Sequence, residues 1–217
     1  MPCLYFSADS DAFVQLTRSI SIQSGISLEQ AATAVRDDKL GDVVEELAGI
    51  PLRFNYSASP TCDDIELSMQ AYEEVYGDYP SLVVVDNITN VLGKSSNGED
   101  DPFSGLESLM DYLATMGRNT EACVVGLHHV TGPFNDADKP IPLSGLKGQI
   151  GRVPAMVLTL HKRPGEIPGT DALCVSTVKN RGGRADPTGQ EFVRLEFTGD
   201  TMSIKDPDDT YAPVNHY

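Results

Sequence analysis

The feature that most constrains this fold is an apolar, uncharged run from Leu82 to Val85 that ends in the carboxylate of Asp86. A short apolar run without polar alternation is typical of a strand buried on both faces of a parallel sheet. Similar runs occupy residues 3–7, 50–56 and 122–127, and helical patterns fill the gaps between them. Strands that alternate with helices predict βαβ units and a parallel sheet.

Local signals place the helices. The first carries Phe13, Leu16 and Ile20 on one face and is expected to stop at Gly25, and Ser27–Gln30 is a capping box that opens the next. Two further helical faces, at residues 65–76 and 106–113, are expected to end at Gly77 and Gly117.

Beyond residue 155 strand-like runs follow in quick succession, at 155–160, 172–178, 192–197 and 201–204. Runs this closely spaced predict antiparallel hairpins. The expected fold is therefore α/β, one domain over residues 1–217, with a mostly parallel twisted sheet flanked by helices and antiparallel edge strands at the C-terminal end.

The net charge of −16 excludes a generic nucleic-acid coat, because phosphate binding needs a basic face. Residues 140–205, however, carry nine Lys/Arg and six Asp/Glu, so a polyanion is expected to contact that stretch if it contacts any. The alternative is a solvated acidic surface. No apolar run is long enough for a membrane span and no signal peptide is evident, so we expect a cytoplasmic protein without membrane contact. Cys3, Cys123 and Cys174 lie in apolar runs and are expected to be reduced core thiols.

Two carboxylates follow strand-like runs. Asp86 is placed to hold Mg²⁺, since ligands of parallel sheets bind beyond the carboxyl ends of the strands; a loop cap is the competing interpretation. Asp9 is placed to orient a water for attack on a phosphate, but the residues alone favour an N-cap for the helix that starts near residue 11.

Further polar groups follow later strands. His128 and His129 are adjacent, so only one of them is expected to reach a given site. Lys179 and Arg181 precede two glycines and suit anion binding, including a phosphate across a subunit interface; a solvated hairpin tip is equally compatible. Gly93-Lys94-Ser95-Ser96 resembles the end of a phosphate loop, but the motif G-x-x-x-x-G-K-[ST] needs glycine where Ile88 stands. We expect no phosphate cradle there.

Taken in order, these pieces resemble the C-terminal RecA-like ATPase domain of DnaB-type replicative helicases, particularly phage-encoded ones. Leu4-Tyr-Phe-Ser-Ala-Asp-Ser10 resembles the strand F-F-S-L-E-M, Leu127-His128-His129 takes the place of L-S-Q, and Lys179-Asn180-Arg181-Gly182 resembles K-x-R-x-G, with Pro187-Thr188-Gly189 after it. The resemblance covers nearly the whole chain. The expected first strand and Walker A loop are absent from it.

The resemblance implies a role for each matched position. Asp86 is the Walker B aspartate, Asp9 stands at the catalytic glutamate and His129 at the sensor. Lys179 and Arg181 would reach the γ-phosphate of a neighbouring subunit, and Lys147 and Arg152 would contact DNA. The implied function is a DNA helicase that hydrolyses ATP with Mg²⁺ (Mn²⁺ as an alternative), forms a homo-oligomeric, hexameric ring on single-stranded or forked DNA, and acts in the cytoplasm of a bacterial host. A separate chain that carries the phosphate loop is a further expected partner.

Two other functions fit the same residues. A metal-dependent DNA nuclease would use Asp9 and Asp86 to bind Mg²⁺ or Mn²⁺ and would not need the phosphate loop. A non-catalytic subunit of a replication or recombination assembly would bind DNA or protein without turnover. The sequence leaves both open.

Overall fold

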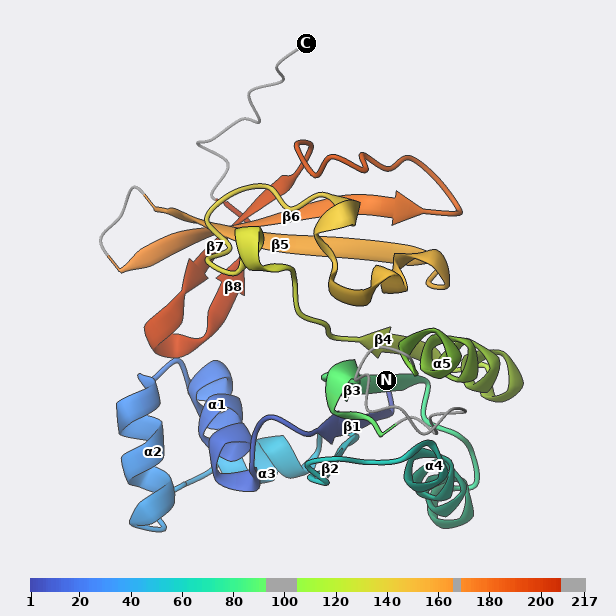
Figure 1. Ribbon diagram of the computed structural model, residues 1–217. Coiled ribbons are helices and arrows are strands. Elements are labelled where there is room, and N and C mark those ends of the chain that lie inside the picture. Colours follow the sequence, from blue (N-terminus) through green and yellow to red (C-terminus); the bar gives the residue numbers. More distant parts are fainter. Residues whose placement is uncertain (93–104, 166–168, 208–217) are drawn as a thin grey trace. The chain divides into compact units, whose positions relative to one another are not determined.

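The computed structural model describes residues 1–92, 105–165 and 169–207, so the Gly93–Ser96 segment lies outside the described residues (Figure 1). The chain divides into two compact units. Unit 1 holds residues 1–15, 44–131 and 146–154, and unit 2 holds residues 16–43, 132–145 and 155–217.

Unit 1 is built on a four-stranded parallel sheet in the order β2-β1-β3-β4. Its strands are β1 (Cys3–Ser7), β2 (Leu52–Asn55), β3 (Leu82–Asp86) and β4 (Cys123–Gly126). The predicted parallel sheet is confirmed. In the register of β1 with β3, Ser7 stands beside Asp86, so the residues after these two strands emerge at the same edge.

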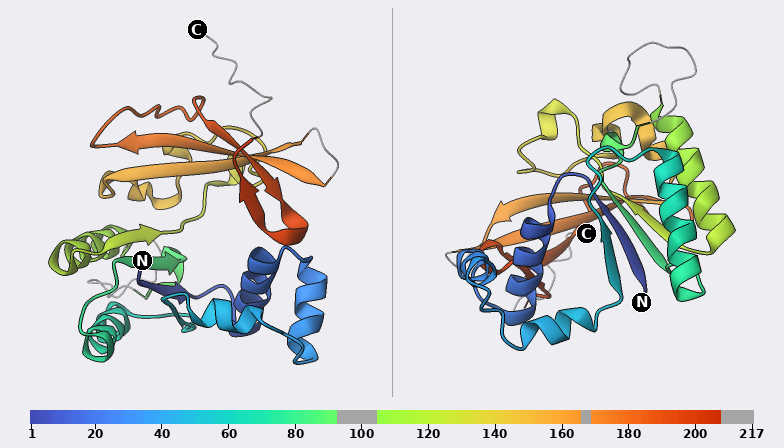
Figure 2. Two further views of the ribbon diagram at one scale, coloured as in Figure 1. Left: turned by 180° about the vertical axis from the view of Figure 1, so that it is seen from behind. Right: turned by 90° about the horizontal axis from the view of Figure 1, so that it is seen from below.

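Helices α4 (Cys62–Tyr76) and α5 (Leu106–Thr120) run side by side and cover one face of this sheet (Figures 1 and 2). The α5 hydroxyl of Tyr112 donates a hydrogen bond to the α4 carbonyl of Cys62 at 3.0 Å. The core between helices and sheet collects apolar side chains from both, among them Phe6, Val83, Val85, Ile65, Met69, Leu109 and Leu113. A capping box at Thr61 and Asp64 opens α4, and Gly77 closes it in the left-handed conformation, as expected.

The expected end of α5 at Gly117 is wrong. The helix continues to Thr120, and Glu121 takes the left-handed conformation. A Cβ at position 117 would lie 3.1 Å from both the Ala122 carbonyl oxygen and Val124 Cγ2. Glycine is therefore explained by the close approach of α5 to the strand that follows it, not by a helix stop.

Unit 2 contains α2 (Leu28–Arg36), most of α1 (Ala12–Ser24) and a second sheet in the order β5-β6-β7-β8. Both sequence signals for the helices hold, since Gly25 follows α1 at a φ of 71° and the capping box at Ser27 and Gln30 forms. Short α3 (Val43–Ala48) is not expected from the sequence.

The second sheet confirms the antiparallel prediction. Its strands are β5 (Met156–Pro164), β6 (Thr170–Asn180), β7 (Val193–Thr198) and β8 (Ser203–Lys205), each antiparallel to its neighbour. Two buried hydroxyls tie one face of it to passing chain, because Thr159 donates to the Ile141 carbonyl and Ser176 to the Gly189 carbonyl, both at 2.8 Å. Gly189 has a φ of 71°, and a Cβ there would lie 2.5 Å from the Ile141 carbonyl oxygen, so this position requires glycine.

Within the described residues, no helix has both the length and the apolar character needed to cross a membrane. All four cysteines are free, and Cys3 and Cys174 are buried as expected. Cys123, expected in the core, is exposed. It lies on β4, the outermost strand of the unit 1 sheet, where one side of the strand is open.

Candidate functional site

The candidate site lies in unit 1, where β1, β3 and β4 end at the same edge of the parallel sheet. Asp86 is the last residue of β3 and is half-buried. Its Oδ2 accepts a hydrogen bond of 2.7 Å from the hydroxyl of Tyr5 on β1. The Walker B-like carboxylate is thus held by a neighbouring strand, not by its own loop.

Asn87 is the centre of the polar network beyond these strands and is only 3% exposed. Its side-chain nitrogen lies 2.5 Å from Asp9 Oδ2 and 3.1 Å from His129 Nε2. Its side-chain oxygen accepts from the backbone nitrogen of Thr89 at 2.9 Å and from the Thr89 hydroxyl, which starts a turn of 3-10 helix at Ile88–Asn90. At the end of this turn Asn90 Nδ2 donates to Asp9 Oδ1 at 2.8 Å. Both carboxylate oxygens of Asp9 are therefore oriented by amides from the β3 loop.

Asp9 does not cap helix α1, which corrects the interpretation that the residues alone favoured. The cap is supplied two residues later, where Asp11 Oδ1 accepts from the Val14 backbone nitrogen at 2.9 Å. The preference for an aspartate at a helix start was right, but there were two candidates. Asp9 is left to face the strand-end network.

The two histidines have different partners, as their adjacency requires. His129 contacts Asn87, whereas His128 Nε2 lies 2.5 Å from the Lys147 carbonyl oxygen. A carbonyl only accepts, so the proton of His128 is on Nε2. Burial lowers the pKa of His128, an effect that this hydrogen bond opposes. His128 therefore anchors the segment that contains Lys147.

Lys147 and Arg152 lie on the 3-10 segment Lys147–Arg152 of unit 1. The backbone nitrogen of Lys147 donates to the His129 carbonyl at 3.3 Å, which fixes the start of this segment to the histidine pair. Arg152 NH1 lies 3.7 Å from Glu107 Oε1, with both side chains more than two-thirds exposed. Exposed pairs of this kind are weak and exchange readily for another anion.

Lys179 and Arg181 lie in unit 2, at the end of β6 and in the turn after it. The Arg181 backbone nitrogen donates to the Ala155 carbonyl at 2.9 Å, and Asn180 Oδ1 accepts from Gly182, so the hairpin turn is closed by its own residues. Burial and the positive charge of Arg181 lower the pKa of Lys179. The two cations therefore act as one concentrated positive site.

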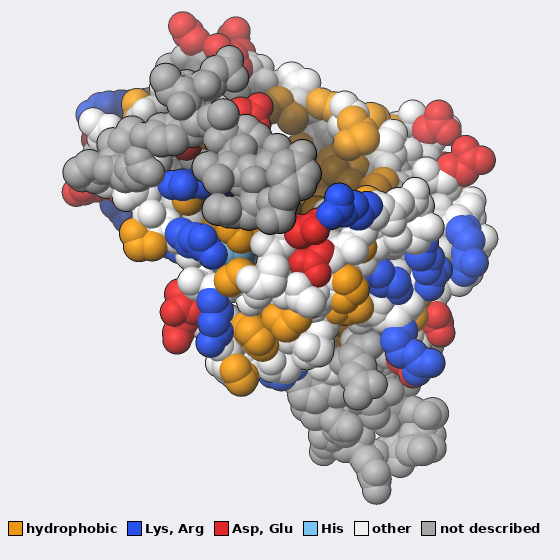
Figure 3. All heavy atoms as spheres, turned by 90° about the horizontal axis from the view of Figure 1, so that it is seen from above, with side chains coloured by type: hydrophobic (Ala, Val, Ile, Leu, Met, Phe, Trp, Pro, Cys, Tyr) orange, Lys and Arg blue, Asp and Glu red, His pale blue; other side chains and the backbone are white. Residues whose placement is uncertain are grey.

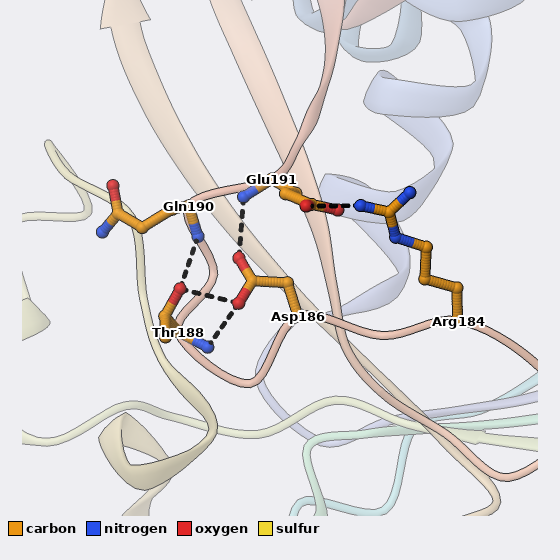
Figure 4. A network of polar contacts seen from close by, with 5 residues as sticks. All are labelled: Arg184, Asp186, Thr188, Gln190 and Glu191. Carbon is orange, nitrogen blue, oxygen red and sulfur yellow. Dashed lines mark hydrogen bonds and ion pairs between the residues drawn. The ribbon is translucent and has the colours of Figure 1, made fainter. Parts of the chain in front are cut away.

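The loop after this hairpin is held by Asp186 (Figure 4). Its carboxylate accepts from the hydroxyl and backbone nitrogen of Thr188 at 2.7 and 3.0 Å and from the backbone nitrogen of Glu191 at 2.8 Å. These hydrogen bonds, led by the Thr188 hydroxyl, lower the pKa of Asp186 to about 2. Arg184 pairs with Glu191 at 2.6 Å on the same loop.

Basic side chains do not merge into one patch on the face seen in Figure 3. Among the described residues there, Lys and Arg stand in separate groups with apolar and acidic side chains between them. This distribution fits a few local anion contacts better than continuous binding along a nucleic-acid backbone.

The donor set fits one divalent ion held largely through water. No group of three or more His, Cys, Asp and Glu side chains within the described residues is arranged to hold a metal ion. Mg²⁺ commonly binds through one or two carboxylates and keeps several waters, which Asp86 at a strand end satisfies. Asp9 is the less suited ligand, because Asn87 and Asn90 already donate to its two oxygens.

Sequence reasoning missed three residues of this network. Asn87 and Asn90 follow the apolar strand directly, and amides at that position signal a polar site without saying which group they hold. The sequence identifies Tyr5 only as a strand residue. Its alternation with Leu4 and Phe6, which are buried in the core, places it on the other face of β1.

Comparison with known proteins identifies relatives in two mycobacteriophages. The chain is 66% identical over 207 residues to the Gene 65 protein of Mycobacterium phage L5, covering 95% of this chain and 76% of the relative. It is 61% identical over 209 residues to the Gene 65 protein of Mycobacterium phage D29, covering 96% of this chain and 89% of the relative. The chain belongs to the mycobacteriophage Gene 65 protein family. No family model matches it.

Solved structures relate the fold of this Gene 65 family member to helicase ATPase domains. A helicase ATPase domain solved by itself superposes with a TM-score of 0.80 at 16% identity, covering 95% of this chain and 75% of that one. A DnaB-like replicative helicase, solved for its interactions with primase, gives 0.78 at 16% identity and covers 94% of this chain and 51% of that one. The α/β fold is thus that of DnaB-like helicase ATPase domains.

Proposed function

We propose that this Gene 65 family member is the ATPase core of a DnaB-like phage helicase that acts in DNA replication. The observation that carries the proposal is the network of Asp86, Asp9, Asn87 and His129 at the ends of adjacent parallel strands. Phosphoryl transfer depends mainly on positioned charge and an oriented attacking oxygen, and this network supplies both. The fold of the solved ATPase domains supports it.

Each residue has a distinct task in the proposed reaction. Asp86, oriented by Tyr5, would hold Mg²⁺, or Mn²⁺ in its place, and the ion would neutralise charge on the phosphates of ATP. Asp9, held at both oxygens, would orient the attacking water. His129 would report the state of the site to Asp9 through Asn87.

Other residues would act between subunits and on DNA. Lys179 and Arg181 form the concentrated positive site expected of groups that stabilise a phosphate of a neighbouring subunit in a hexameric ring. Lys147 and Arg152 would contact the backbone of single-stranded DNA, Arg152 by exchanging Glu107 for a phosphate. We place this activity in the cytoplasm of the bacterial host, with residues 1–217 forming one ATPase-core domain.

A forked-DNA assay tests the proposal. The protein is incubated with end-labelled forked DNA and Mg²⁺, with and without ATP, beside the Asp86→Asn variant. ATP-dependent strand separation that the variant lacks is expected. Shortening of the label without ATP, again lost in the variant, would instead establish a nuclease, for which the described residues offer no three-ligand metal cluster. DNA binding without either reaction would leave an accessory subunit.

A further inference from the structure

Strand β4 is an open edge of the unit 1 sheet, since in the strand order it pairs only with β3. Its sequence, Cys123-Val124-Val125-Gly126, contains no charge and no proline. Val125 is 43% exposed, and Leu127, which follows the strand, is 40% exposed. Apolar edges of this kind recruit another strand unless they are protected.

The opposite edge of the same sheet is protected, which makes β4 unusual within its own fold. Strand β2 carries the exposed cation Arg53 in its middle and follows Pro51. Charged side chains and proline are the usual devices against strand addition. Only β4 combines an apolar sequence with exposed side chains, as expected of a strand that is internal in the complete sheet.

The direction of the β4 hydrogen bonds identifies the groups that an added strand would use. Cys123 donates to the Ser81 carbonyl and Leu127 to the Val85 carbonyl, each at 2.9 Å. Backbone groups alternate along a strand, so Val124 and Gly126 direct their N–H and C=O groups away from β3. These two residues form the outer edge of β4.

We propose that the outer edge of β4 binds, in parallel, an apolar extended strand from polypeptide outside these 217 residues. An apolar strand fits because its side chains would cover Val125 and Leu127, and the parallel direction continues that of the four strands present. Family members contain such additional polypeptide, since the matched region covers 76% of the phage L5 relative.

The added strand would also complete the candidate site, a consequence that rests on the proposed function. A strand parallel to β4 ends at the edge where His128 and His129 follow β4 and Asp86 ends β3. The loop that leaves it would therefore begin beside the Asp9–Asn87–His129 network. Backbone N–H groups of such a loop would supply the phosphate ligands for which this sequence has no G-x-x-x-x-G-K-[ST] motif.

Hydrogen exchange of two amides tests the strand addition directly. The probe is a chimera in which the residues of the L5 relative outside the matched region are joined to this chain in their native order. Exchange at the Val124 and Gly126 amides, followed by NMR, is expected to slow by about tenfold or more relative to the 217-residue chain. Unchanged exchange at both amides would overturn the proposal.

A pair of variants isolates the outer amide. Val124→Pro removes the outward N–H and leaves the hydrogen bonds to β3, a change that open edges tolerate. Val124→Ala is the matched control, because it shortens the side chain equally and keeps the N–H. We expect the extra loss of Tm in Val124→Pro over Val124→Ala to be larger in the chimera than in the 217-residue chain. Equal extra losses would contradict an added strand.

Two outcomes separate this inference from its alternatives. If a second copy covers β4, the 217-residue chain alone will exchange slowly at Val124 and lose that protection on dilution, which would overturn the proposal. Neither readout involves ATP. Slow exchange in a chimera that does not hydrolyse ATP would therefore sustain the strand addition and count only against the proposed helicase.

Discussion

The side-chain nitrogen of Asn87 lies 2.5 Å from Asp9 Oδ2 and joins two strand ends that are far apart in the sequence. The same nitrogen also contacts His129, so one buried amide holds a carboxylate from the β1 end and an imidazole from the β4 end. An NH₂ group has two hydrogens, and the two contacts use both. Asn87 is therefore the joint of the site.

Replacing Asn87 with alanine is expected to lower the ATPase kcat by about tenfold to a hundredfold, the usual effect of losing an outer partner of a reacting group. KM for ATP should change little, because Asn87 positions Asp9 and is not proposed to bind nucleotide. Asn90→Ala is the matched control, since it removes a single hydrogen bond to Asp9 and should give a smaller loss. Steady-state kinetics measure both, and an equal loss in the two variants would argue against Asn87 as the joint.

The contact with Asn87 also determines which substitutions of His129 are tolerated. Because Asn87 donates, His129 Nε2 accepts and its ring proton is on Nδ1. His129→Gln keeps an acceptor and should retain most of the ATPase activity, whereas His129→Lys offers only donors and should lose most of it. Comparable activity in the two variants, with comparable Tm values, would rule out an accepting role.

The Tyr5 hydroxyl is expected to tune metal binding through Asp86. Tyr5→Phe keeps the ring and its contact with Phe54 but removes the 2.7 Å hydrogen bond to Asp86 Oδ2. Loss of an outer partner weakens metal affinity by about tenfold to a hundredfold. A titration followed by the Mn²⁺ EPR signal measures the Kd, with Asp86→Asn as the variant without the ligand. Unaltered Mn²⁺ affinity in Tyr5→Phe would place the metal elsewhere.

Much of the fold is predictable because its signals are local. The apolar runs, the capping boxes at Ser27 and Thr61, and the left-handed Gly77 each depend on a few consecutive residues. The errors come from contacts distant along the chain or across the sheet. The pattern around Gly117 indicates a helix stop although its constraint comes from Val124, and the apolar run around Cys123 indicates a core position although it lies on an edge strand.

The site is predictable in part for the same reason. A carboxylate after an apolar strand is visible in the sequence, so Asp86 is found. The role of Asn87 is not visible, because it depends on the parallel order of β1, β3 and β4, which brings Asp9 and His129 to one amide.

Gly126 is expected to tolerate no side chain because of Ile88. A Cβ at Gly126 would lie 2.9 Å from Ile88 Cγ2, and Ile88 is fully buried. Gly126→Ala should therefore destabilise the protein by about 1–3 kcal/mol, the usual range for overpacking. Ile88→Leu removes the branched methyl and should recover part of that loss in the double variant, so the two effects are non-additive. Urea denaturation measures each free energy of unfolding, and strict additivity would locate the strain elsewhere.

His161 should make stability fall in mild acid. The side chain is 1% exposed, and neither ring nitrogen has a hydrogen-bond partner within the described structure. Burial, and then the charge of Arg163, lower the pKa of His161 below its ordinary value near 6.5. As pH falls through 6.5 the unfolded chain takes up a proton that the folded chain resists, so stability is lost below that pH and is unaffected above it. In His161→Leu, removing two unpaired buried nitrogens should stabilise the protein by about 1–3 kcal/mol at pH 7.5. The variant should also flatten the dependence of the unfolding free energy on pH between 5 and 7. Parallel pH profiles for the two proteins would show that another group titrates.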